Sequence, residues 1–161
     1  MRRDYRGWMM HFEPITEKEF PDYWRYSVES WIRDMQRAGF LREDITLEEA
    51  EKEVRKFIPS GLSTEGHHIM HIIDNENAVG TIWYEIRDKA MKEAYLWDIL
   101  IDENQRGRGY GKEAMRELER TAKKEGARRI QLNVFGFNSI ARNLYLKMWY
   151  QDAAITMMKY L

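Results

Sequence analysis

Residues 98 to 112 read D-I-L-I-D-E-N-Q-R-G-R-G-Y-G-K, and this stretch decides the fold. A short apolar segment ends in a polar corner, glycines follow at every second position (Gly107, Gly109, Gly111), and a periodic helix begins at once. Glycine is needed where the backbone takes a positive φ or approaches a ligand without a Cβ. The first N–H groups of a helix, at the positive end of its dipole, bind phosphate. The stretch therefore predicts an anion-binding turn between a strand and a helix.

The charges and spacing of this turn narrow the possible ligand. Arg106, Arg108 and Lys112 add three cations, so we expect a phosphorylated cofactor. A P-loop does not fit, because only three residues separate the outer glycines and Glu113 stands where that motif has Ser or Thr. The dinucleotide fingerprint G-x-G-x-x-G does not match the spacing G-x-G-x-G either. The pattern that remains is R-x-x-G-x-G.

The composition is that of a globular protein. The chain has 161 residues, 43% of them hydrophobic and 13% aromatic, and no apolar run is long enough to span a membrane. The absence of cysteine excludes disulfides, Cys-ligated zinc and a cysteine nucleophile. The N-terminal sequence M-R-R-D-Y-R-G-W lacks the apolar core of a signal peptide. We therefore expect a single soluble, cytoplasmic domain over residues 1–161.

The net charge of −1 makes nucleic-acid binding by the whole domain unfavourable. Residues 106–129 carry nine Lys or Arg against four Glu, and residues 43–53 carry six acids against one Lys. The glutamates that interrupt the basic segment argue against an RNA contact. The basic excess falls on the predicted anion-binding turn and the helix after it.

Hydrophobic periodicity predicts the other elements. Strands are expected at residues 8–15, 68–73, 79–86, 94–101, 129–135 and 154–161, and helices at 20–38, 47–58, 109–126 and 138–148. Thr16 with Glu19, and Thr46 with Glu49, have the spacing of capping boxes. The strands at 79–86 and 94–101 are joined by a charged turn, which suggests an antiparallel hairpin.

Two segments together resemble the GNAT superfamily of N-acetyltransferases. The first is the R-x-x-G-x-G turn, which resembles that family's acyl-CoA diphosphate loop. The second, L-N-V-F-G-F-N-S-I-A-R-N-L-Y-L-K at 132–147, resembles its later strand, the Asn that begins the next helix and a Tyr seven residues on. The whole chain also resembles the small bacterial YycN-type branch. The resemblance implies the α/β (α+β) acyl-CoA N-acyltransferase fold, a mixed, mostly antiparallel sheet with helices on both sides.

The resemblance also implies a cofactor site. The strand ending at Ile101 would diverge from the strand at residues 130–134, and the pantetheine of acetyl-CoA would lie in the gap, bound by main-chain groups near Ile99 and Ile101. Asn138 would belong to the same site. The diphosphate would bind the turn made by Arg106, Gly107, Arg108, Gly109, Tyr110, Gly111 and Lys112. No metal is expected, because a thioester is already activated and a backbone N–H can stabilise the oxyanion.

Two residues are the candidate acid and base. Tyr145 stands at the family's position for the acid that protonates the departing thiolate, although its pattern also fits a core aromatic. Asp98 interrupts an apolar strand and is the candidate base, directly or through water. It could instead face outward or bind a cationic substrate, and Glu85 is a weaker rival. The implied reaction is direct acetyl transfer to a primary amine of a small molecule, peptide or protein in a ternary complex.

Several points stay open. The chain could be a catalytically silent acyl-CoA-binding sensor or scaffold, it could form a homodimer, and the acceptor amine is not specified. His67 and His71 share a strand face, but no further ligand completes a metal site. The aromatic helix at 20–38 is expected in the core, with one of the Tyr23, Trp24 and Trp31 rings possible at the acceptor pocket. Trp149 replaces a glycine that usually ends the last helix; keeping the left-handed conformation there would cost about 1 kcal/mol.

Overall fold

The computed structural model describes residues 10–87, 90 and 92–161. Its sheet has five strands in sequence order: β1 (Met10–Pro14), β2 (His67–Asp74), β3 (Asn77–Ile86), β4 (Glu93–Ile101) and β5 (Arg129–Leu132). Neighbours from β1 to β4 are antiparallel, and β5 is parallel to β4. The predicted mixed, mostly antiparallel sheet is confirmed. Of the first predicted strand, residues 8 and 9 lie outside the described residues.

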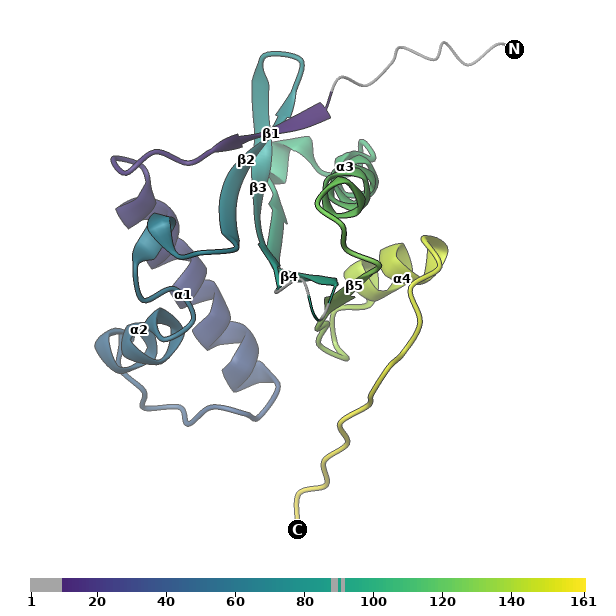
Figure 1. Ribbon diagram of the computed structural model, residues 1–161. Coiled ribbons are helices and arrows are strands. Elements are labelled where there is room, and N and C mark those ends of the chain that lie inside the picture. Colours follow the sequence, from purple (N-terminus) through teal and green to yellow (C-terminus); the bar gives the residue numbers. More distant parts are fainter. Residues whose placement is uncertain (1–9, 88–89, 91) are drawn as a thin grey trace.

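Helices cover both faces of the sheet (Figure 1). On one side lie α1 (Phe20–Arg37) and α2 (Leu47–Arg55), and on the other α3 (Tyr110–Lys124) and α4 (Ser139–Lys147). Short 3-10 helices, η1 (Gly61–Ser63) and η2 (Glu103–Gln105), lie in the connections. Each face has its own core. Val28 and Val54 pack with Trp83 on the α1 side, and Met115 and Leu118 pack on the α3 side.

The two capping boxes form as the sequence predicts. The Thr46 hydroxyl accepts a hydrogen bond from the Glu49 N–H, and the Glu49 carboxylate accepts one from the Thr46 N–H. Thr16 and Glu19 exchange the same pair of bonds just before α1. These contacts satisfy N–H groups that a helix start leaves without intrahelical acceptors. The Thr46 box caps α2, whereas the Thr16–Glu19 bonds form in the turn that leads into α1, whose N-cap, Glu19, has no side-chain cap.

Half-way along β4 the sheet opens. Pairing with β5 runs from Glu93 opposite Arg129 to Leu96 opposite Leu132 and then stops. The register against β3 shifts at this point, since Tyr84 pairs with Leu96 but Trp83 pairs with Asp98. Trp97 is therefore the extra residue of a β-bulge, which bends a strand and increases its twist. β4 turns away from β5, and a gap opens between the two strands.

Two of the predicted strands differ from the structure. The strand expected at 129–135 ends at Leu132, because β4 has diverged and offers no further partner. The strand expected at 154–161 was wrong: residues 150–161 have no regular structure and leave Ile155, Met157 and Tyr160 exposed. A strand needs a neighbour, and this tail runs away from the sheet (Figure 1). No helix in the described part of the chain is long and apolar enough to cross a membrane.

Candidate active site

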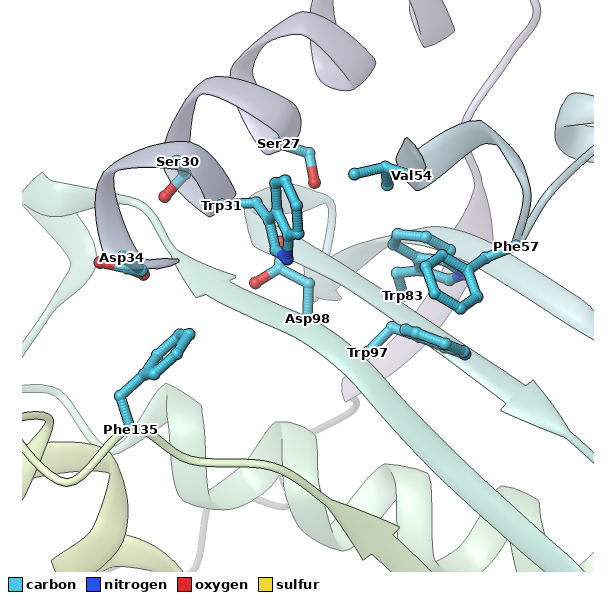
Figure 2. A pocket seen from close by; sticks show the side chains of 10 residues that line it. All are labelled: Ser27, Ser30, Trp31, Asp34, Val54, Phe57, Trp83, Trp97, Asp98 and Phe135. Carbon is cyan, nitrogen blue, oxygen red and sulfur yellow. The ribbon is translucent and has the colours of Figure 1, made fainter. Parts of the chain in front are cut away.

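A cavity of about 140 Å³ lies between the N-terminal helices and the sheet (Figure 2). It is lined by Ser27, Ser30, Trp31, Asp34, Val54, Phe57, Trp83, Trp97, Asp98 and Phe135. The four residues from α1 follow the spacing i, i+3, i+4, i+7 and so share one helix face. Asp98 comes from β4 and Phe135 from the segment after β5, on either side of the gap. The cavity therefore meets the gap between these strands.

The β-bulge brings two successive side chains into this cavity. In a regular strand neighbouring side chains point to opposite faces. Here Trp97 and Asp98 both line the cavity on the α1 side, whereas Leu96 and Ile99 pack into the core on the α3 side. The extra residue thus places an aromatic ring and a carboxylate next to each other at the gap.

The Asp98 carboxyl is electrostatically perturbed. Burial raises the pKa of Asp98 to about 6; a hydrogen bond from the Ile99 N–H opposes the rise, and the charge of Asp34 adds to it. Among the described residues no Lys, Arg or His forms an ion pair with either of these aspartates. At neutral pH Asp98 is mainly ionised and is a stronger base than an ordinary aspartate.

Tyr145 approaches the gap from the opposite face. It lies on α4 and is buried in the α3-side core, with its ring 5.7 Å from that of Tyr150. Burial, and secondly the charge of Asp98, raise the pKa of Tyr145 to about 12. The phenol therefore keeps its proton at neutral pH. The charge of Asp98 thus acts on the Tyr145 hydroxyl, although the two side chains come from different faces of the sheet.

The main chain of the second half of β4 faces the gap at alternate residues. The Asp102 N–H donates to the Val79 carbonyl at 3.0 Å, so even-numbered residues after the bulge direct their main-chain groups toward β3. The groups of Ile99 and Ile101 consequently point the other way. The Ile101 carbonyl accepts a hydrogen bond from the Arg106 Nε at 3.1 Å. Both isoleucines were predicted to bind the cofactor, and the main-chain groups of both lie at the gap.

The three glycines of the anion-binding turn have two different roles. Gly107 and Gly109 have φ values of 77° and 90°, and α3 begins directly after Gly109. A Cβ at either position would meet no atom within 4 Å, so the space beside the turn is open. A Cβ on Gly111 would lie 3.4 Å from the Leu144 Cδ2, so this glycine allows α3 and α4 to approach. The turn thus combines left-handed backbone with a helix N-terminus.

The charged and polar residues of the turn have the following contacts. The Arg108 guanidinium donates to the Gln105 Oε1 at 3.1 Å, and Lys112 is exposed. The Tyr110 hydroxyl donates to the Asp74 Oδ2 at 2.9 Å, which raises the pKa of Tyr110 and ties its side chain to β2. Only its main chain lies at the turn.

Asn138 is the N-cap of α4. Its Oδ1 accepts a hydrogen bond from the Ala141 N–H at 3.1 Å, so the side chain has a structural role at the start of this helix. The same helix carries Tyr145 to the gap. A cofactor contact of Asn138 stays a prediction.

Comparison with known proteins places this geometry in a family. The model of the acetyltransferase (GNAT) family matches residues 8–149. The chain belongs to the GNAT family. YycN of Bacillus subtilis, described as an uncharacterized N-acetyltransferase, is 33% identical over 150 residues, which are 91% of this chain and 95% of the relative.

Solved structures agree with the GNAT assignment. The crystal structure of Bacillus subtilis YycN matches with a TM-score of 0.89 and 27% identity over 95% of this chain and 99% of that one. The expected resemblance to the YycN-type branch is thereby confirmed. A Clostridium acetobutylicum protein solved with acetyl-CoA shares the GNAT fold at 18% identity, with a TM-score of 0.63 and coverage of 94% and 96%.

The remaining polar candidates of this GNAT protein are held in structural contacts. Glu85 accepts hydrogen bonds from the Trp97 Nε1 at 3.1 Å and the Arg87 Nε at 3.2 Å, and it does not line the cavity. The His67 Nδ1 accepts a bond from the Trp83 Nε1 at 3.1 Å, and burial lowers the pKa of His67. Within the ranges that the structure describes, no group of three His, Cys, Asp or Glu side chains could hold a metal ion.

Part of the cavity lining was not predicted from the sequence. Asp34, Phe57 and Phe135 were not selected, because they come from three separate elements. The available signal was a set of polar residues on the inward stripe of α1, where Ser27 and Asp34 interrupt aromatic and aliphatic positions. Trp31 lines the cavity, in agreement with the suggestion that one ring of this helix borders the acceptor pocket.

Proposed function

We propose that this protein transfers the acetyl group of acetyl-CoA to a primary amine by direct attack in a ternary complex. One observation carries the proposal: the cavity that contains Asp98 opens onto the gap between β4 and β5, so an amine and a thioester can meet there. Family membership and the relative solved with acetyl-CoA support this co-substrate.

The residues around the gap suit acetyl-CoA along its length. The main-chain groups of Ile99 and Ile101 would hold pantetheine as a neighbouring strand would be held. The open space beside Gly107 and Gly109 fits a diphosphate, and the cations of the same turn, Arg106, Arg108 and Lys112, complement its charge. Asn138, at the start of α4, would complete the site.

The pKa values support Asp98 as the base and Tyr145 as the acid. A protonated amine has no lone pair, so Asp98 accepts its proton, and the raised pKa of this carboxyl makes it a better base than an ordinary aspartate. The amine nitrogen then forms a bond to the acetyl carbon as the carbon–sulfur bond breaks. Tyr145, which is still protonated, donates its proton to the departing thiolate, and the second proton that the nitrogen loses on becoming an amide restores the phenol.

A turnover screen tests the proposal. Acetyl-CoA is supplied with diamines, aminoglycosides, amino acids, peptide N-termini and protein lysines, and released CoA is detected as free thiol. We expect turnover above the hydrolysis background with at least one amine class, and about 100-fold or greater loss in Tyr145→Phe. Acetyl-CoA binding without turnover over the whole panel would contradict the proposal and indicate a silent acyl-CoA sensor or scaffold.

A further inference from the structure

The cavity that faces the gap has the lining of a cation-binding site (Figure 2). Its walls are aromatic: the Trp83 and Trp97 rings stack with centroids 5.3 Å apart, and the Phe57 ring lies 4.7 Å from Trp97. Trp31 and Phe135 add two further rings to the lining. Aromatic faces attract ammonium groups. This lining favours a positively charged ligand with an aliphatic body.

The two carboxylates of the cavity have no positive partner in the described part of the chain. Neither Asp34 nor Asp98 forms an ion pair there, yet they lie close enough for Asp34 to raise the pKa of Asp98. Two like charges facing one small, partly buried space are unfavourable unless a counter-charge is bound. The buried Tyr23 hydroxyl lies beside Ser27 and is subject to the same Asp98 charge. The cavity therefore lacks positive charge and has polar groups left to satisfy.

The position of Asp34 in its helix sharpens this conclusion. Asp34 lies in the last turn of α1, which ends at Arg37. The negative end of a helix dipole disfavours an acid and favours a cation. No side-chain hydrogen bond to Asp34 exists among the described residues. The fold of α1 does not explain this acid, whereas a bound cation would.

We propose that the acceptor is a small aliphatic diamine, whose reacting amine lies at Asp98 and whose second ammonium is held by Asp34 and the aromatic rings. This inference rests on the proposed function and specifies its substrate class. The hydroxyls of Ser27 and Ser30 accept further hydrogen bonds from the ammonium groups. The volume of about 140 Å³ resembles that of a cavity that holds benzene, which suits a short diamine rather than an aminoglycoside.

The first test compares amines of equal length. Diaminopropane to diaminohexane are assayed against the n-alkylamine and the amino alcohol of the same chain length. We expect kcat/KM for the best diamine to exceed both matched amines by about tenfold or more, because only the diamine places a charge at Asp34. Equal kcat/KM values for diamine and monoamine would overturn the diamine inference and leave the acetyltransferase proposal intact.

The second test removes the charge at the distal position. Asp34→Asn should raise KM for the diamine by about tenfold more than KM for the matched monoamine, because only the diamine loses a charge partner. The matched control is Asp22→Asn, an exposed acid in the first turn of α1 that does not line the cavity. Equal losses for both substrates in Asp34→Asn would overturn the inference, because they would indicate a structural role.

A binding measurement separates this inference from the proposed function. Diaminobutane is titrated into the protein without acetyl-CoA, and the fluorescence of the cavity tryptophans is followed in wild type and Asp34→Asn. We expect saturable binding that Asp34→Asn weakens by about tenfold. Such binding without turnover would overturn the acetyltransferase proposal and leave a diamine site. Turnover of amines without Asp34-dependent binding would overturn the diamine site alone.

Discussion

Residues 94–96 of β4 pair with strands on both sides, whereas residues 98–101 pair only with β3. The acids of the two halves differ accordingly. Glu93 is fully buried and accepts hydrogen bonds from Arg87 and Arg129, so protein charges neutralise it. Asp98 has no such partner in the described part of the chain. In the closed half the charge holds strands together, and in the open half it is left for a ligand.

The largest expected effect comes from neutralising the acid of the open half. Asp98→Asn should lower kcat/KM by about 100- to 10,000-fold, because the amine loses its proton acceptor. In the wild type kcat/KM should rise with pH through about 6, where Asp98 ionises, and this limb should be missing from the variant. The measurement is kcat/KM between pH 5 and pH 9. A limb that persists in Asp98→Asn would assign the base to another group.

Neutralising the acid of the closed half should instead affect stability. Glu93→Gln should lower the free energy of unfolding by about 2 to 4 kcal/mol, because Arg87 and Arg129 lose their shared carboxylate. Urea unfolding measures it. The control Glu76→Gln, at an exposed acid of the β2–β3 turn, should change stability by about 0.5 kcal/mol or less. A fall in kcat larger than the loss of folded protein would show that the two halves are not independent.

The buried Asp98 carboxyl of the open half should also make the stability of the protein depend on pH. Because folding raises the pKa of Asp98, the folded state favours the protonated carboxyl, and stability is lost as pH rises through about 6. Asp98→Asn avoids this cost. The free energy of unfolding of the variant should exceed that of the wild type by up to about 3 kcal/mol at pH 8, with a smaller difference toward pH 4. Urea unfolding at the two pH values measures the difference. A variant less stable than wild type at pH 8 would contradict the burial of an unpaired charge.

The smallest effect concerns the turn beyond the open half. Gly109 and Gly126 flank α3 with φ values of 90° and 89°, and neither has an atom within 4 Å of its Cβ position. Alanine at either should cost about 1 kcal/mol of stability. Only Gly109→Ala should also weaken acetyl-CoA binding, by about tenfold in calorimetry, because its methyl enters the proposed diphosphate site. Equal acetyl-CoA affinities of the two variants would show that the diphosphate does not bind beside Gly109.

Sequence patterns predicted what local chemistry determines. The glycine turn, the two capping boxes and the hairpin of β3 and β4 depend on neighbouring residues, and all three appear where expected. Trp149 also adopts the left-handed conformation discussed for the end of α4, with φ 68° and 90% exposure. The backbone of Trp149 is therefore in a strained conformation, although burial of its ring does not compensate for this strain.

Features that depend on contacts between residues far apart in the sequence were not predicted. The bulge at Trp97 lies in the run Y-L-W-D-I-L-I. Apart from Asp98 this run has apolar residues on both faces of the strand, so its polarity pattern does not show where the alternation of side chains shifts by one residue. Asp34 and Asp98 come to line the same cavity only when α1 packs on the sheet. The tail at 154–161 has apolar residues typical of a strand but no edge to join. The catalytic and cofactor assignments along β4, α3 and α4 remain predictions for the experiments above.

The bulge gives β4 one residue more than the sheet requires. Without Trp97, Leu96 and Asp98 would follow each other opposite Tyr84 and Trp83, and every remaining side chain would keep its face. The strand would then be straight enough to continue along β5, which would close the gap. We therefore expect a one-residue deletion at this point to give a more regular sheet and to remove the proposed meeting place of the thioester and the amine. A surface loop tolerates a change in length. A change in the length of β4 would instead alter the site while the fold is kept.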